Sequence, residues 1–255
     1  MIFDCHTHTK FSADSEMSAV DAIKKAENLN LGIIFTEHFD YDAPGEYDFT
    51  FDPKKYFAEY KKFRGEKIRL GVEVGLRKSA REINKNFIAS ADFDMVIGSI
   101  HLVDDFDIYY PEFFAGKDKN TAYKKYFAAM IEETSAEDFD VLGHIDYICR
   151  SAPYENPAID YENFKSEIDE VLKIIVEREK ILELNTRRLD KKSVPDELLP
   201  IYRQYKNLGG KFITIGSDAH KVESVGNYFK TALNFAEELN LTPVTFKNRQ
   251  IELCE

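Results

Sequence analysis

Seven short apolar runs, separated by stretches of helical periodicity, constrain the fold of this 255-residue chain more than any other feature. Strands that alternate with helices build βαβ units with right-handed crossovers and a parallel sheet. The predicted strands cover residues 2–4, 32–36, 68–74, 95–99, 141–143, 181–185 and 211–215. The predicted helices cover residues 18–30, 79–89, 121–134, 161–179, 195–208 and 225–239, and a further helix starts at Pro53.

Domain organisation follows from length and composition. No Pro/Ser-rich linker or change of composition divides the chain, and its length is common for a single α/β barrel. We therefore expect one domain over residues 1–255. Seven strand–helix units, with the chemically interesting residues at the strand ends, favour a barrel over an open sheet.

All six histidines fall at or just after the C-terminal end of a predicted strand. Strand ends are where α/β folds gather site residues from distant parts of the sequence. His6 and His8 lie two apart, so an extended chain points both imidazoles to the same side. Asp218 and His220 repeat this spacing after the last predicted strand, and Glu73 ends the third.

Imidazole and carboxylate together are a ligand set for Zn, Mn, Fe or Co. Asp14, in the loop after the first strand, is a further candidate or else a turn residue. The donor set is His6, His8, Asp14, His38, Glu73, His101, His144, Asp218 and His220. These exceed the four ligands of one tetrahedral Zn. The sequence therefore predicts two or three divalent transition-metal ions.

Charge and composition narrow the classes of partner. The net charge of -12 argues against nucleic-acid binding, which needs a basic surface, but it permits a small anionic substrate at bound metal ions. Three scattered cysteines give no disulfide framework or CxxC metal site. The N-terminus has no signal-peptide pattern and no apolar stretch is long enough to span a membrane, so we expect a cytoplasmic protein. The sequence does not indicate an oligomeric state.

The chemistry predicted for this donor set is hydrolysis. The chain carries no P-loop, dinucleotide fingerprint or nucleophilic serine elbow. Clustered metal ions generate a nucleophilic hydroxide near neutral pH and clamp the oxygens of a displacement at phosphorus. Phosphate recognition also needs arginines. The candidates are Arg150, Arg187 and Arg188, each of which could instead be a solvated surface charge.

The motifs, in this order, are HTHT, TEH, GVEVG, GSIH, GHID and GSDAH. Together they closely resemble the polymerase-and-histidinol-phosphatase (PHP) family over about 220 residues, from the first motif to the last. Within that family, the opening FDCHTHTKFSADS and the later ELNT resemble the histidinol-phosphate phosphatase branch. Many members have histidine where this chain has Asp14. The carboxylate could therefore change which metal binds at the site that contains Asp14, or how fully that site is occupied.

The resemblance implies a distorted (β/α)7 TIM-like barrel with a trinuclear metal centre. Glu73 would bridge two ions and Asp218 would ligate the first, so both would be catalytic residues. His6, His8, Glu73 and Asp218 would hold the first ion, Glu73, His101 and His144 the second, and Asp14, His38 and His220 the third. A hydroxide bridging the ions would hydrolyse a small anionic phosphomonoester, L-histidinol phosphate, in histidine biosynthesis. Arg150 and one of Arg187 and Arg188 would clamp the phosphate.

Three alternatives remain open on sequence alone. Another PHP phosphoesterase, acting on nucleotides, phosphotyrosine or DNA ends, would use the same metal ions. The amidohydrolases also open with HxH and close with Asp, but they typically use eight strands and many carry a carboxylated lysine where this chain has Glu73. A non-enzymatic metal-binding module predicts missing ligands, whereas all nine positions are filled.

The substrate pocket would need acidic or polar groups, for which the loop residues Asp42, Glu46, Asp104 and Asp105 are candidates.

Overall fold

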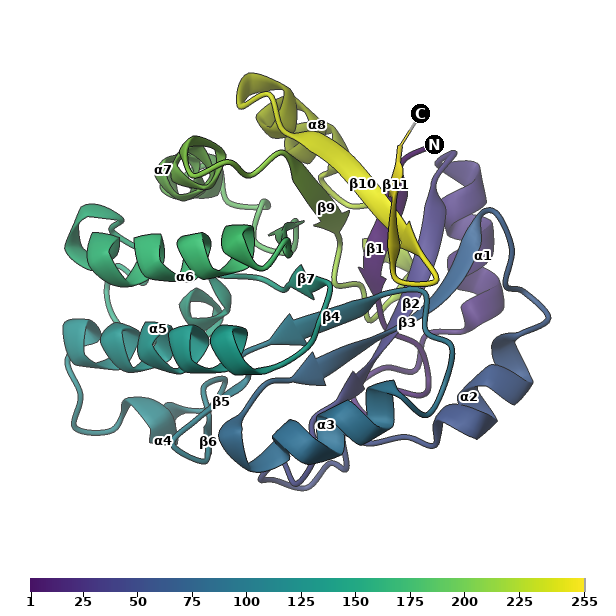
Figure 1. Ribbon diagram of the computed structural model, residues 1–255, viewed down its shortest axis with the longest axis horizontal. Coiled ribbons are helices and arrows are strands. Elements are labelled where there is room, and N and C mark those ends of the chain that lie inside the picture. Colours follow the sequence, from purple (N-terminus) through teal and green to yellow (C-terminus); the bar gives the residue numbers. More distant parts are fainter. Residues whose placement is uncertain (255) are drawn as a thin grey trace.

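The computed structural model, which describes residues 1–254, is built around a nine-stranded sheet with helices packed along its outer side (Figure 1). The strands follow one another in chain order: β1 (Phe3–Thr7), β2 (Gly32–Phe39), β3 (Ile68–Gly75), β4 (Val96–Ser99), β7 (Val141–Leu142), β8 (Ile181–Asn185), β9 (Phe212–Gly216), β10 (Thr242–Lys247) and β11 (Gln250–Leu253). Pairing is parallel from β1 to β10 and antiparallel between β10 and β11. All seven predicted strands are confirmed, and this α/β fold has a largely parallel sheet.

The first strand lies beside the chain segment that follows β9. Thr7 and Ala219 form a parallel bridge, in which the His8 amide donates to the Ala219 carbonyl at 2.9 Å. The Asp218 amide in turn donates to the His6 carbonyl at 2.8 Å. Hydrogen bonds from Ser217 and Gly226 to the Asp4 carboxylate also join β1 to the chain after β9, but within residues 1–254 the bridge does not extend into a strand ladder. Closure into a seven-stranded barrel stays a prediction, which the bridge supports.

Helices connect the successive strands, as the periodicity predicts. They are α1 (Ala19–Asn28), α2 (Pro53–Tyr60), α3 (Arg81–Ile88), α4 (Pro111–Phe114), α5 (Lys119–Ala136), α6 (Lys165–Glu177), α7 (Val194–Asn207) and α8 (Phe229–Glu238), with the 3-10 turns η1 (Lys78–Ala80), η2 (Tyr147–Arg150), η3 (Glu162–Phe164) and η4 (Val222–Ser224). The Ser18 hydroxyl caps α1 and the Asp52 carboxylate caps α2, whose first residue is Pro53.

The connection after His101 is more structured than the loop we expected. It contains a two-stranded hairpin, β5 (Leu102–Val103) and β6 (Phe106–Asp107), followed by the short α4. Asp104 and Asp105 form the turn, both with positive φ, as a two-residue hairpin turn requires. Strands this short leave little periodic signal in the sequence.

The side chains of each strand alternate between two faces, and this alternation places the site. On β2, Ile33 and Phe35 belong to the large hydrophobic cluster that also contains helix residues, whereas Ile34 belongs to a smaller cluster. On the face of Ile34, the strands become polar toward their C-terminal ends. There β2 presents His38 and β3 presents Glu73. On this face of the sheet, an apolar layer thus lies next to a buried polar region at the C-terminal ends of the strands.

Candidate metal centre

The Glu73 carboxylate, at the end of β3, is the centre of the histidine cluster. Its side chain is fully buried, and both oxygens face imidazole nitrogens. Oε1 lies 2.9 Å from Nε2 of His144 and 3.4 Å from Nε2 of His101. Oε2 lies 3.2 Å from Nε2 of His6, 3.5 Å from Nε2 of His8 and 3.0 Å from Nδ1 of His38. One carboxylate therefore touches five imidazoles that come from four strand ends and from the segment after β1.

The remaining predicted donors complete one side of this cluster. Asp218 Oδ1 lies 3.5 Å from His8 Nε2 and 3.5 Å from His220 Nδ1. Asp14 Oδ2 lies 3.0 Å from His220 Nε2 and 3.8 Å from His38 Nε2. The structure thus brings all nine predicted donor residues together, including Asp14, whose loop position left a turn role open.

Several of these atoms point into the cluster without a hydrogen-bond partner. They are buried and comprise Nε2 of His6, Nε2 of His8, Nδ1 of His38 and Oε2 of Glu73. Unpaired buried polar atoms cost free energy unless something satisfies them. A divalent cation does so, because neutral imidazole nitrogen and carboxylate oxygen are its natural ligands. The residues present therefore fit metal ions.

Five groups of three residues each place one donor atom per residue within 4.8 Å of the others. Three of these groups are His6, His8 and Glu73; Glu73, His101 and His144; and His8, His38 and His220. A fourth joins His6, His144 and Asp218, and the fifth brings in a residue that we did not predict, Asp40, with His38 and His101. Donors are thus spread over a volume larger than one coordination sphere.

Hydrogen bonds behind the cluster orient the rings. His6 Nδ1 lies 2.7 Å from Glu183 Oε1, and His101 Nδ1 lies 2.8 Å from Asp40 Oδ1. The Ser99 hydroxyl donates to Glu73 Oε1 at 2.6 Å. Metal-binding histidines commonly direct the second ring nitrogen to a carboxylate, which fixes the tautomer and the ring plane. Sequence reasoning missed these groups, although Asp40 follows the end of β2 and Glu183 is the central residue of β8.

Glycines on neighbouring strands make room for these orienting groups. A Cβ added at Gly75 would overlap Oδ1 of Asp40, and one added at Gly216 would overlap Oε1 of Glu183. These close approaches explain why glycine occupies two positions within strands, where it otherwise weakens the sheet.

The two central carboxylates stay ionised in this surrounding. Burial opposes ionisation of Glu73, but the imidazoles around it outweigh burial and hold its pKa well below the ordinary value. Burial likewise opposes ionisation of Asp218, and Arg150, His6 and Arg187 hold the pKa of Asp218 well below its ordinary value. Both groups therefore act as acceptors only.

Two of the three predicted arginines reach the cluster. Arg150, from η2, donates to Asp218 Oδ2, and Arg187, after β8, lies 3.2 Å from Asp218 Oδ1. Arg188 is buried and faces away, because its guanidinium donates to Asp146 and to Glu197. The structure thus brings Arg150 and Arg187, but not Arg188, to the donor set.

Cavities open on two sides of the histidine cluster, and one of about 250 Å³ is lined by Arg187, Asp218 and His220 among others. A small one, about 60 Å³, is lined by Asp14, His38, Asp40, His101 and Asp107 among others. Asp107 also lines a larger cavity of about 560 Å³. The walls of the larger cavity are Pro44, Gly45, Glu46, Tyr47, Asp105, Phe106, Asp107, Tyr110 and Glu112. These residues include four carboxylates and three aromatic rings, and no lysine or arginine. We call it the acidic cavity.

Comparison with known proteins gives a consistent result. The family model described as PHP domain matches residues 4–187. A probable histidinol-phosphatase from Clostridium acetobutylicum is 47% identical over 250 residues, covering 98% of each chain. The histidinol-phosphatase of Lactococcus lactis subsp. lactis is 35% identical over 225 residues, covering 85% of this chain and 83% of its own.

A solved structure is similar over almost the whole chain. The crystal structure of histidinol phosphate phosphatase from Lactococcus lactis subsp. lactis, complexed with zinc, L-histidinol and phosphate, superposes with a TM-score of 0.92. It is 31% identical and covers 98% of both chains. Among the described residues, no helix combines the length and the apolar character that crossing a membrane requires.

Proposed function

This chain belongs to the PHP domain family, and from that premise we propose that it is a metal-dependent phosphatase that hydrolyses L-histidinol phosphate to L-histidinol and phosphate. The observation that carries the proposal is the buried Glu73 carboxylate within reach of five imidazoles, with unpaired donor atoms directed into the cluster. The similarity to phosphatases of this substrate extends over nearly the full length. We take residues 1–255 as one phosphoesterase domain with a (β/α)7 barrel.

The ligand sets that we propose are those that the family resemblance implies, and the first two each contain a group of close donor atoms. One ion would be held by His6, His8, Glu73 and Asp218, and a second by Glu73, His101 and His144. Where a third is bound, it would be held by Asp14, His38 and His220. When bound, divalent zinc, manganese, iron or cobalt ions would supply an activated water and neutralise the charge on phosphate oxygens.

The chain's own cations bind the phosphate beside this centre. Arg150 and Arg187 flank Asp218 on its two oxygens, so both guanidinium groups are held where a phosphate on the cluster would meet them. Arg150 is 12% exposed and its guanidinium lies 4.7 Å from the Tyr147 ring, which fixes its position. Arg187, 46% exposed, is free to close over an arriving phosphate. An arginine pair matches the planar oxygens of a phosphomonoester better than lysine would.

The acidic cavity suits the other half of this substrate. Histidinol carries an ammonium group and a basic imidazole, and both are recognised by carboxylates and aromatic faces. Glu46 and Asp105, two of the loop residues considered from sequence, line this cavity, and Asp107 connects it to the histidine cluster. A nucleotide or DNA end would place anionic groups against the same carboxylates, which opposes binding of those substrates.

The test is phosphate release from a panel of phosphomonoesters and diesters, using protein loaded separately with zinc, manganese, iron(II) or cobalt. We expect a strong preference for L-histidinol phosphate, and we expect His8→Ala and Glu73→Ala to abolish it while circular dichroism stays unchanged. Equal turnover of diesters or nucleotides would move the chain to another activity within the family. Full activity in both variants would overturn the proposed site.

A further inference from the structure

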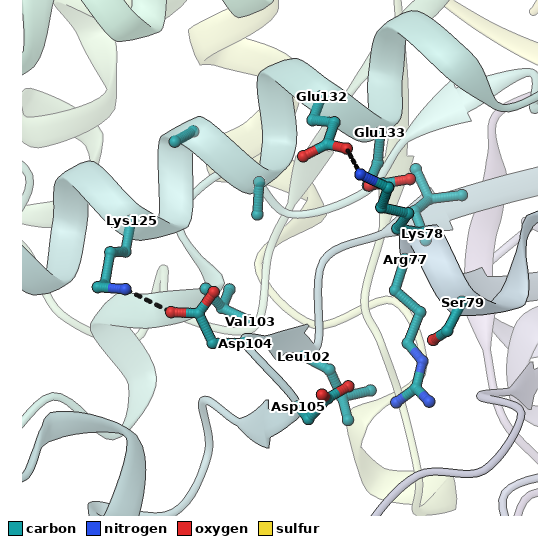
Figure 2. Close-up of a pocket in the computed structure, with 13 residues that line it drawn as sticks. Arg77, Lys78, Ser79, Leu102, Val103, Asp104, Asp105, Lys125, Glu132 and Glu133 are labelled. Carbon is teal, nitrogen blue, oxygen red and sulfur yellow. Dashed lines mark hydrogen bonds and ion pairs between the residues drawn. The ribbon is translucent and has the colours of Figure 1, made fainter.

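A separate cavity of about 560 Å³ lies between η1, the β5–β6 hairpin and α5 (Figure 2). Its walls are residues 76–79, residues 102–105 and five residues of α5. Leu76, Leu102, Val103 and two alanines of α5 give it an apolar part, and charged side chains surround that part. None of the nine donor residues lines it. We call it the η1 cavity.

Most charges around the η1 cavity are already paired. Lys125 contacts Asp104, and Lys78 lies 3.5 Å from Glu132; Figure 2 draws both pairs as dashed lines. Glu133 receives the Arg81 guanidinium at 2.8 Å. Two charged residues of the wall are not part of these pairs, the cation Arg77 and the anion Asp105.

The more weakly paired cation is Arg77. Its side chain is 13% exposed and its Nε is buried without a hydrogen-bond partner. Within residues 1–254, the carboxylate recorded near its guanidinium is that of Asp42, at 3.8 Å and itself 79% exposed. The Nε atoms of Arg69 and Arg188 also lack a hydrogen-bond partner, but the terminal nitrogens of both donate to carboxylates. The terminal nitrogens of Arg77 have only the long ion pair with Asp42, so this guanidinium is open to a further oxyanion.

The unpaired anion is Asp105, which makes no ion pair or hydrogen bond recorded within the described part of the chain. It occupies the hairpin turn with φ of 63°, and the turn fixes where its carboxylate is presented. The η1 cavity therefore offers one open positive and one open negative group beside an apolar surface. Four carboxylates in its wall disfavour a ligand that is only anionic.

We propose that the η1 cavity binds a free α-amino acid as a zwitterion. Its carboxylate accepts from the Arg77 guanidinium, for which a planar two-oxygen group is the matching partner. Its ammonium group faces Asp105, and its side chain lies on Leu76, Leu102 and Val103. This site uses none of the residues assigned to the metal ions or to phosphate, and it shares one wall residue, Asp105, with the acidic cavity.

The test is a thermal-unfolding titration of the metal-loaded protein with each common L-amino acid. At least one should raise the unfolding temperature in a saturable way. Arg77→Met and Asp105→Asn should each weaken its binding by about tenfold or more, as expected for the loss of a charged hydrogen bond. The matched control is Arg203→Met, which removes an exposed arginine of α7 and should leave binding unchanged. Asp105 lies in an exposed turn, so its variant reports binding even if Arg77→Met impairs folding.

Three outcomes would overturn the proposal. These are no stabilisation by any amino acid at millimolar concentration, stabilisation that survives in both variants, and an equal Arg77-dependent effect of acetate or inorganic phosphate alone. Because the readout is binding, each of these leaves the phosphatase proposal untouched. Loss of phosphatase activity likewise leaves this one standing.

Discussion

The Nδ1 atom of His6 lies 2.7 Å from Oε1 of Glu183, and neither side chain is exposed to solvent. Glu183 also accepts the backbone N–H of His144 at 2.8 Å, so one carboxylate on β8 positions residues of two other strand ends. With Nδ1 engaged, His6 directs Nε2 toward Glu73, 3.2 Å away.

Replacing Glu183 by Gln should weaken metal binding by roughly 10- to 100-fold, the usual cost of losing such a partner. The measurement is metal content per chain after dialysis against graded chelator, together with kcat. The matched control is Glu238→Gln, at the exposed end of α8, which should bind metal like the unaltered protein. Normal metal content in Glu183→Gln would show that Glu183 does not position His6.

Gly216→Ala should displace the Glu183 carboxylate and His6, which pack against this glycine. A Cβ there would overlap both Oε1 of Glu183 and the Cβ of His6, and buried overpacking costs about 1–3 kcal/mol. We expect lower stability in urea unfolding and lower metal content. Gly65→Ala is the matched control, because the nearest atom to a Cβ added there is the backbone oxygen of Phe63, 4.0 Å away. Equal behaviour of the two variants would contradict the close approach at Gly216.

Substitutions of the adjacent residues Arg187 and Arg188 should have different effects, the first on catalysis and the second on stability. Arg187→Met should lower kcat/KM with little change in unfolding, since this half-exposed side chain contacts Asp218 at the cluster. Arg188→Met should instead cost about 3 kcal/mol of stability, because it leaves the buried Asp146 carboxylate unpaired. Kinetics and urea unfolding of both variants decide this. A catalytic defect in Arg188→Met without loss of stability would reverse the assignment.

Removal of metal ions should destabilise the protein. Without cations, the orphaned atoms of Glu73 and the imidazoles lose their partners, so chelation should lower the unfolding temperature. Added zinc, manganese, iron(II) or cobalt should restore it along with phosphate release. His8→Ala should show a smaller response to chelator, and an unchanged unfolding temperature after complete metal removal would contradict the proposed centre.

Glu137 makes stability depend on pH. Burial raises its pKa to about 7, against the effect of the hydrogen bond from Asn84. The native state therefore holds a proton that the unfolded chain has already released above its ordinary pKa of about 4.5. The stability that this group contributes is full below pH 4.5 and is lost as the pH rises through 7, a loss of about 3 kcal/mol. Urea unfolding of wild type and of Glu137→Gln at pH 5 and pH 8 tests this prediction. The difference in unfolding free energy in favour of wild type should be smaller at pH 8.

The strands and metal donors were predictable because both leave periodic or spaced signals. Apolar runs marked the seven strands β1–β4 and β7–β9, and a histidine or acidic residue lay at each of the ends that form the cluster. The orienting groups were not predictable in this way. Asp40, after β2, and Glu183, within β8, resemble any carboxylate on a strand until the structure places them against His101 and His6.

The arginines show a second limit of sequence reasoning. Arg187 and Arg188 are adjacent, and only the backbone direction after β8 decides which one faces Asp218. The β10–β11 hairpin and the β5–β6 hairpin were missed for a different reason. Their strands are short or partly exposed, so local periodicity is weak and tertiary pairing determines them.

The bridge between Thr7 and Ala219 has a consequence for how the protein matures. It joins His6 and His8, among the first residues to be synthesised, to Asp218 and His220, which follow more than two hundred residues later. A nascent chain still lacking its last sheet segments has imidazoles but no wall to hold them together. We therefore expect stable metal loading to wait until the segment of Asp218 and His220 has been synthesised and has paired with β1, so that ion capture reports that this part of the fold has formed.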